Sequence, residues 1–195
     1  MEQKANMETY NGLQYFVSYR LIKYPRLEFK SGSLVAILPK SGIAANEFIK
    51  KHEKWINDRT LIINQALENA KEKKLQRRPT DYRFRDVIYS LSLSFCKEFG
   101  FNVNKLYLRR MNSKWASYSQ KGNLTVNALL KYLPDTLIDY VIFHEVAHSV
   151  ERAHNKRFWR ILSKRFPNHA QLEKELLVYW FLIKTKSNLN ITKIL

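Results

Sequence analysis

Two histidines stand four positions apart near the middle of the segment 141–159, and a glutamate follows the first of them. His144, Glu145 and His148 form the pattern H-E-x-x-H. On a helix, residues at this spacing lie on one face, one turn apart, so both imidazoles can bind a single cation. Glu145 points about 100° further round the helix, which places it off the metal but beside a water molecule on it. Two neutral nitrogen ligands and an adjacent carboxylate are suited to metal-assisted hydrolysis.

A catalytic zinc ion needs a third protein ligand and an open fourth position. On a helix that continues, Glu151 shares the histidine face but lies another turn along the axis, out of reach of a cation held between the two rings. His154 follows His148 where the chain can turn back. We therefore predict one Zn²⁺ ion bound by His144, His148 and His154, with Glu145 as the catalytic base. We expect the Glu151 carboxylate to orient one of the imidazoles by a hydrogen bond.

Two other interpretations of the motif are weaker. The spacing of the three histidines matches the metzincin pattern H-E-x-x-H-x-x-G-x-x-H, but Glu151 stands in place of its glycine, and every methionine precedes the motif. Alternatively, the histidines belong to the core, beside a salt-bridged Glu145. The motif is surrounded by apolar residues, so its helix should be buried, and buried polar side chains need partners. A metal ion with its bound water would provide partners for both histidines and for Glu145.

Residues before and after the motif carry a resemblance to a known family. In chain order these are Lys114-Trp115-Ala116-Ser117, the turn at 120–123, Asn127, the motif, His154 and Phe158-Trp159. The order is similar to that of YgjP-like zinc metallopeptidases, which are akin to the SprT type of zincin. Lys114 and Ala116 replace the family's usual arginine and glycine. The resemblance covers most of residues 100–166 and, more weakly, the first third of the chain.

These observations together predict a zinc-dependent metallopeptidase acting on a protein or peptide. The zinc would lower the pKa of its water to about 7, and Glu145 would take the proton and pass it to the leaving amine. Two alternatives stay open: a zinc hydrolase that acts on a non-peptide substrate, such as an amide or phosphoester, and a binding module with a structural metal.

The formal net charge of +17 is large for 195 residues, and its distribution adds a third alternative. The segments 99–134 and 152–172 contain many basic residues and no acidic one. Basic patches attract phosphate, and aromatic rings among them can stack on bases. The rings concerned are those of Tyr107, Trp115, Tyr118, Phe158 and Trp159. With the resemblance to the SprT type of zincin, this charge implies a nucleic-acid-associated, SprT-like protease as the alternative; the simpler interpretation is a solvated basic face.

The elements that position the motif are predicted from periodicity and caps. Residues 1–79 should form an extension. Its segment 13–38 should contain three short strands, or a hairpin and a partner, and its segment 44–75 should be helical, as one bent helix or two. Residues 80–195 should form the catalytic domain, although the two parts could be one compact unit. We expect the catalytic domain to begin with a helix from Thr80 to Gly100, followed by strands at 103–111, 114–118 and 124–126. The motif helix should then start at a capping box of Thr136 and Asp139. A helix capped by Asn155 and a last helix from 168 to about 184 should follow.

The expected fold is α+β and zincin-like, with a small antiparallel or mixed sheet packed on the metal-binding helix. An extended peptide can add to the exposed edge of such a sheet. The strand with Lys114, Trp115 and Tyr118 is the candidate substrate edge, although Trp115 could equally pack on the core. His169 is expected to lie at the surface, without a role.

The single cysteine, Cys96, should be a small buried hydrophobic residue, since no disulfide can form within the chain. The N-terminal segment lacks the apolar core of a signal peptide, and no apolar run is long enough to span a bilayer. We therefore expect a cytoplasmic protein without a membrane partner.

Overall fold

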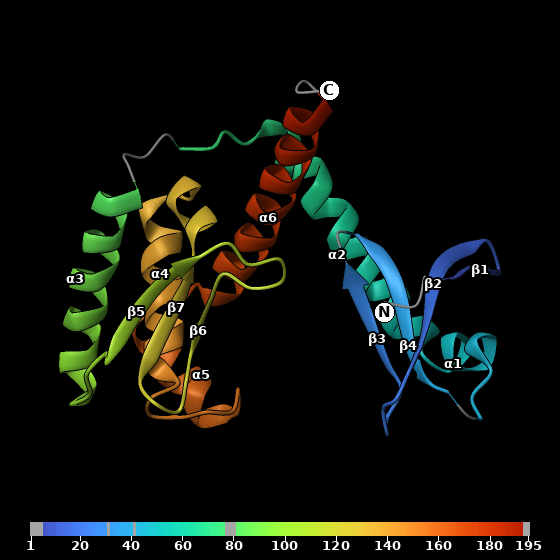
Figure 1. Cartoon of the computed structure of the whole chain (residues 1–195), viewed down its shortest axis with the longest axis horizontal. Coiled ribbons are helices and arrows are strands. Elements are labelled where there is room, and N and C mark those ends of the chain that lie inside the picture. The colour runs from blue at the N-terminus through green and yellow to red at the C-terminus, as the bar shows by residue number, and fades with distance from the viewer. Residues whose placement is uncertain (1–5, 31, 41, 77–80, 193–195) are drawn as a thin grey trace. The chain divides into compact units, whose positions relative to one another are not determined.

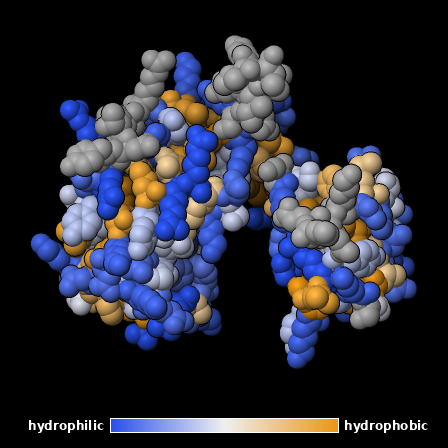
Figure 2. Space-filling model, in the orientation of Figure 1, coloured by the Kyte–Doolittle hydropathy of each residue, from blue (hydrophilic) through white to orange (hydrophobic). Residues whose placement is uncertain are grey.

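The computed structural model of the protein describes residues 6–30, 32–40, 42–76 and 81–192. The chain forms two compact units, Met1–Glu68 and Asn69–Leu195 (Figure 1). The domain boundary predicted between residues 79 and 80 lies outside the described residues and stays a prediction. The face of the molecule seen in Figure 2 is mostly hydrophilic, as expected from the high net charge.

The first unit is built on a sheet with the strand order β1-β2-β4-β3. Its strands are β1 (Asn6–Tyr10), β2 (Leu13–Arg20), β3 (Arg26–Lys30) and β4 (Ser33–Pro39). β2 and β4 run parallel in the centre, and each edge strand is antiparallel to its neighbour. The prediction of three strands missed β1. This edge strand is short and mostly exposed, so its sequence does not alternate as a half-buried strand does.

Two helices follow this sheet, α1 (Ala45–Lys51) and α2 (Glu53–Glu72), with a break at His52. The two-helix alternative of the prediction is therefore the correct one. Ile49 of α1 and Ile56 of α2 are fully buried and join Tyr15 and Leu38 of the sheet in one apolar cluster. Burial of these side chains holds the first unit together.

The first helix that lies wholly within the second unit is α3 (Asp81–Phe99), which ends at Gly100 as predicted. Gly100 has φ +70°, the left-handed conformation that a glycine adopts after a helix end. The predicted cap Thr80 lies outside the described residues. Cys96 is fully buried on α3, as expected for a small hydrophobic residue.

A three-stranded mixed sheet follows, formed by β5 (Lys105–Arg109), β6 (Ala116–Tyr118) and β7 (Asn123–Asn127) in the order β5-β7-β6. β5 is parallel to β7, whereas β6 is antiparallel to it. The turn between β6 and β7 contains Gly122 at φ +69°, a backbone conformation that would be strained in a residue with a side chain. The strand order makes β6 an edge strand, as the sequence predicts.

The motif helix is α4 (Asp135–Ala147), which follows the 3₁₀ helix η1 (Ala128–Tyr132). It is buried on nearly all sides and contacts α3, β6 and the two later helices. The expected α+β fold is confirmed, with the mixed sheet packed on this helix. The capping box of Thr136 and Asp139 is wrong: the helix starts earlier, at Asp135, so Pro134 is the N-cap and no side chain caps it.

The last two helices are α5 (Lys156–Arg165) and α6 (His169–Thr192), and α6 extends beyond the predicted end. The Asn155 side chain accepts hydrogen bonds from the N–H groups of Arg157 and Phe158, so it caps α5 as predicted. Among the described residues, no helix combines the length and apolar character that crossing a membrane requires.

Candidate metal centre

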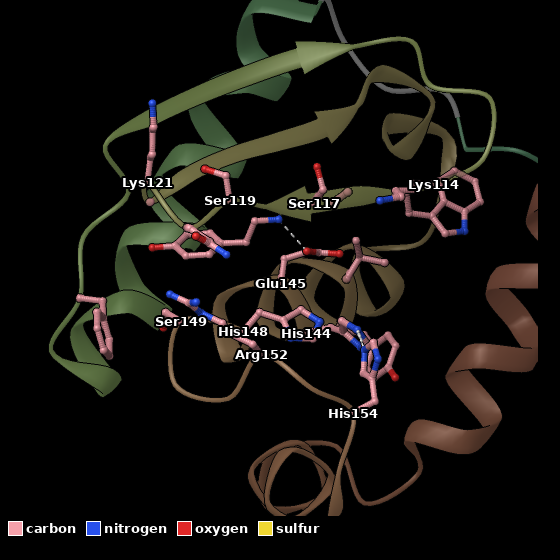
Figure 3. A pocket seen from close by; sticks show the side chains of 18 of the residues that line it. Lys114, Ser117, Ser119, Lys121, His144, Glu145, His148, Ser149, Arg152 and His154 are labelled. Atoms are coloured by element: carbon pink, nitrogen blue, oxygen red, sulfur yellow. Dashed lines mark hydrogen bonds between the residues drawn. The ribbon is translucent and has the colours of Figure 1, made fainter. Parts of the chain in front are cut away.

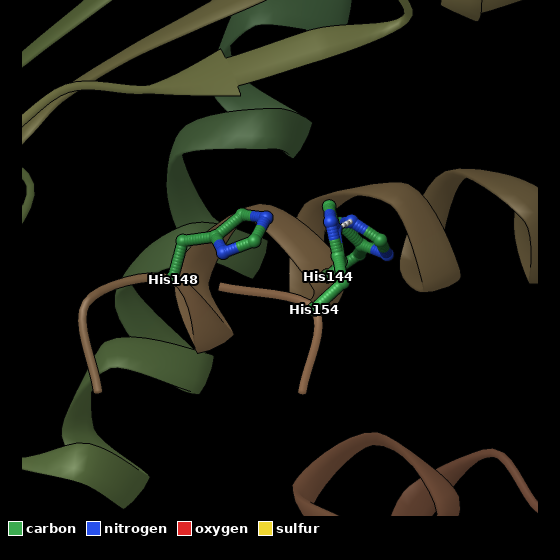
Figure 4. Close-up of side chains that lie close together, drawn as sticks. All are labelled: His144, His148 and His154. Carbon is green, nitrogen blue, oxygen red and sulfur yellow. Dashed lines mark hydrogen bonds between the residues drawn. The ribbon is translucent and has the colours of Figure 1, made fainter. Parts of the chain in front are cut away.

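The three predicted histidine ligands converge on one point (Figure 4). One ring nitrogen from each of His144, His148 and His154 lies within 4.8 Å of the others. The two Nε2 atoms of His144 and His154 are 2.9 Å apart. Nitrogen ligands of a tetrahedral zinc lie about 3.3 Å from one another, given zinc–nitrogen bonds of about 2.0 Å. The set is therefore close to the arrangement that one small cation requires.

The end of α4 explains how His148 is oriented. The helix stops at Ala147, with His148 as its C-cap, and the chain then turns, so Glu151 does not lie on the helix face as expected from the sequence. Its main-chain carbonyl instead accepts a hydrogen bond from Nδ1 of His148 at 3.0 Å. A carbonyl can only accept, so Nδ1 carries the proton and Nε2 keeps its lone pair. The Glu151 carboxylate accepts from the N–H of Ala153 at 3.3 Å, not from an imidazole.

Phe158 forms an apolar floor beneath the three imidazoles. Its ring is fully buried and stacks on His148, with centroids 4.6 Å apart and planes at 23°. It also meets His144 and His154 edge to face, at 4.9 and 4.7 Å. The ring fixes the imidazoles from one side, and it is not exposed for stacking on a base. That part of the nucleic-acid interpretation is wrong for Phe158.

Trp159 holds the third histidine from its other side. The indole stacks on His154 at 5.7 Å with planes at 29°, and its Nε1–H donates to the His154 carbonyl at 3.0 Å. His169 also stacks on the indole, at 5.0 Å with planes at 25°, and its Nδ1 is buried. The expectation that His169 lies at the surface without a role missed this stack, because α6 returns to the site only in the folded chain.

Burial keeps His144 neutral. It lowers the pKa of His144 to about 3, and the neighbouring His148 and His154 add to this shift by repelling a second positive charge. A neutral imidazole offers a lone pair at physiological pH. The donor set therefore fits a divalent cation without prior loss of a proton from His144.

The Glu145 carboxylate lies between α4 and the sheet (Figure 3). Its Oε2 accepts a hydrogen bond from the main-chain N–H of Tyr118 in β6, at 2.8 Å. Burial raises the pKa of Glu145, and the nearby His148 ring, the Tyr118 N–H and the nearby Lys114 oppose that shift. The carboxyl is thus more basic than an exposed glutamate, which favours a role as proton acceptor.

The centre opens into a cavity of about 920 Å³ between β6 and the end of α4. The cavity is lined by the three histidines, Glu145 and all three residues of the predicted substrate edge, namely Lys114, Trp115 and Tyr118. Trp115 is half-buried and also meets Trp180 edge to face at 5.0 Å. The two roles that the sequence leaves equally open for Trp115 are therefore combined, since the side chain both packs and lines the cavity.

Comparison with known proteins decides the family. The model of the YgjP-like metallopeptidase domain matches residues 57–178, which is more than half of the chain. The chain belongs to the YgjP-like metallopeptidase family. Its members are metallopeptidases, so this YgjP-like chain is an enzyme that acts on peptide bonds with a metal ion. The resemblance noted in the sequence is confirmed.

Solved structures similar to this YgjP-like protein include two archaeal metallopeptidase zymogens, Pyrococcus abyssi abylysin and Methanocaldococcus jannaschii jannalysin. Each is 24% identical to this chain in an alignment that covers 46% of this chain. The alignments cover 91% of abylysin and 90% of jannalysin, with TM-scores of 0.41 and 0.40 respectively. No curated protein matches the sequence.

Proposed function

We propose that this metallopeptidase uses zinc, held by His144, His148 and His154, and that Glu145 is its general base. The observation that carries the proposal is the convergence of three imidazole nitrogens within 4.8 Å at the floor of a cavity that Glu145 also lines. Three histidine ligands with one open position are typical of catalytic zinc. We also propose residues 80–195 as the catalytic domain, with residues 1–79 as an extension.

Zinc, when bound, would acidify water and polarise the scissile carbonyl. Glu145 would accept the proton of the attacking water and deliver it to the leaving amine. Its Oε2 already accepts a hydrogen bond from the Tyr118 N–H, so we assign this transfer to Oε1. The hydrogen bond also fixes the rotation of the carboxylate, so that Oε1 is held in one place between the two steps. Glu151 would orient His148 through its carbonyl group.

The β6 edge supports an extended peptide as the substrate. Asn127 donates to the Trp115 carbonyl and Ser119 donates to the Asn123 carbonyl, at 2.8 and 2.9 Å, so the main-chain groups of alternate residues face β7. The N–H and C=O of Ala116 therefore face the free edge. We propose that a substrate strand pairs with Ala116 there, because the Tyr118 N–H is already bound to Glu145.

The proposed chemistry is tested by digesting a peptide library with the zinc-loaded protein and with Glu145→Gln, and identifying the products by mass spectrometry. We expect cleavage by the parent and a loss of at least about 100-fold in the variant, because the general base is removed. Zinc content should be equal in the two. Equal cleavage would remove Glu145 from the mechanism. Hydrolysis of amide or phosphoester substrates without any peptide cleavage would favour a hydrolase with a non-peptide substrate.

A further inference from the structure

A second cavity, of about 540 Å³, lies apart from the metal centre in the same unit. The two cavities share no lining residue. β5 contributes to the second cavity, and it is the sheet edge opposite β6, which borders the catalytic cavity. Among the described residues that line the second cavity, four are basic and none is acidic: Arg85, Arg109, Arg110 and Lys131.

The fold brings these cations together from three separate elements. Arg85 comes from α3, Arg109 ends β5 and is followed by Arg110, and Lys131 comes from η1. In the part of the chain that the structure describes, none of the three arginines forms an ion pair with a carboxylate. Arg85 donates to the Leu106 carbonyl at 3.4 Å, and Arg109 lies over the Tyr107 ring at 4.8 Å. These three arginines repel one another because no carboxylate of a described residue pairs with them, and a bound anion relieves that repulsion.

The residue types indicate which anion fits. Arginine presents a planar fork of N–H donors that matches the oxygens of a phosphate group. The three arginines are exposed and distributed over the cavity wall, so they suit a ligand with several phosphates in a row better than one enclosed ion. Tyr132, half-buried in the same wall, offers a ring on which a base can stack.

We propose that this cavity binds the phosphodiester backbone of a nucleic-acid strand. The site is independent of the metal centre, so a strand bound there would keep the peptidase next to nucleic acid without entering the catalytic cavity. Binding should therefore not require Glu145 or zinc.

The test is fluorescence anisotropy of a labelled single-stranded oligonucleotide titrated with the full chain over a series of salt concentrations. The informative variant is R109Q/R110Q. Its charge-matched control is R59Q/R160Q, which removes two exposed arginines that do not line the cavity. We expect the cavity variant to weaken binding at least tenfold and the control less than threefold. The plot of log K against log salt concentration has a negative slope, and each phosphate interaction that the variant removes should make this slope shallower by about 0.7.

Three further arms make the result decisive. R109K/R110K, which keeps the charge, should retain most of the affinity, and Glu145→Gln should bind like the parent. Inorganic phosphate should displace the oligonucleotide only at millimolar concentration. Displacement at micromolar concentration would show that the cavity is a site for a small ion and would overturn the proposal of a nucleic-acid strand. Equal loss of affinity in R109Q/R110Q and R59Q/R160Q would show only general attraction to a basic protein. Tighter binding of a glutamate-rich peptide of equal charge would assign the cavity to an acidic protein instead.

Discussion

The main-chain N–H of Tyr118 donates a hydrogen bond to Oε2 of Glu145 at 2.8 Å and so joins the edge strand to the motif helix. The two residues are 27 positions apart in the chain. Because the donor is a backbone group, the hydrogen bond is independent of the Tyr118 side chain. One oxygen of the proposed base is thus held by the same strand that we propose pairs with the substrate.

This hydrogen bond predicts that a proline at position 118 impairs catalysis. Tyr118→Pro removes the N–H, which does not face β7, so the hydrogen bonds between the strands stay intact. A hydrogen bond to a charged group is worth about 1.5–3 kcal/mol, so we expect kcat to fall about 10- to 100-fold with unchanged zinc content. Tyr118→Ala, which keeps the N–H, is the matched control. Equal kcat values for the proline and alanine variants would show that the amide does not orient Glu145.

The buried position of Glu145 predicts that Glu145→Gln stabilises the metal-free protein at neutral pH. Burial raises the pKa of Glu145 above its ordinary value of 4.5, so the folded state binds the proton more tightly than the unfolded chain. The ionised carboxylate therefore destabilises the fold at pH 7, and this penalty disappears as the pH falls through the raised pKa to below 4.5. We expect the variant to melt about 2–4 °C higher at pH 7.

The measurement for this prediction is thermal unfolding of both proteins after chelation, followed by circular dichroism between pH 7 and pH 4. The stabilisation by glutamine should shrink steadily on acidification. A difference in melting temperature that grows toward low pH would mean that the folded state stabilises the ionised carboxylate and that the pKa of Glu145 is lowered.

The stack of His154, Trp159 and His169 predicts a role for the indole in metal affinity. Trp159→Phe keeps a ring but removes the hydrogen bond to the His154 carbonyl, and Trp159→Leu removes both the stack and the hydrogen bond. Groups that orient metal ligands typically contribute 10- to 100-fold to affinity, so we expect zinc to bind about 10-fold more weakly in the first variant and about 100-fold more weakly in the second.

Competition with a chromophoric chelator measures these affinities. Trp55→Phe is the control, because Trp55 packs on Phe29 in the first unit and touches no ligand. If all three variants bind zinc as the parent does, the indole fills space beside His154 without orienting it.

The parts of the site that were predictable from sequence are those set by local spacing. The H-E-x-x-H pattern places two rings on one helix face, and Asn155 and Gly100 mark helix ends through their own backbone chemistry. His154 was predictable because the helix must end before a third ligand can turn back. Each of these predictions depends only on a few residues that are neighbours in the sequence.

The remainder depends on contacts across the fold. No glycine marks the end of α4, so the sequence predicts a helix that continues to Glu151 and gives no sign that the Glu151 carbonyl contacts His148. His169 reaches Trp159 only because α6 packs beside α4. The arginine cavity needs α3, β5 and η1 together. Hydrophobic periodicity carries no information on such pairings.

The central claim is that three imidazoles hold one zinc ion, and metal analysis of the purified, zinc-equilibrated protein tests it most directly. We expect close to one zinc per chain in the parent after exhaustive dialysis and far less in His154→Ala, with both proteins folded by circular dichroism. Retention of the same zinc content by His154→Ala, or its absence from the parent, would contradict the proposed site.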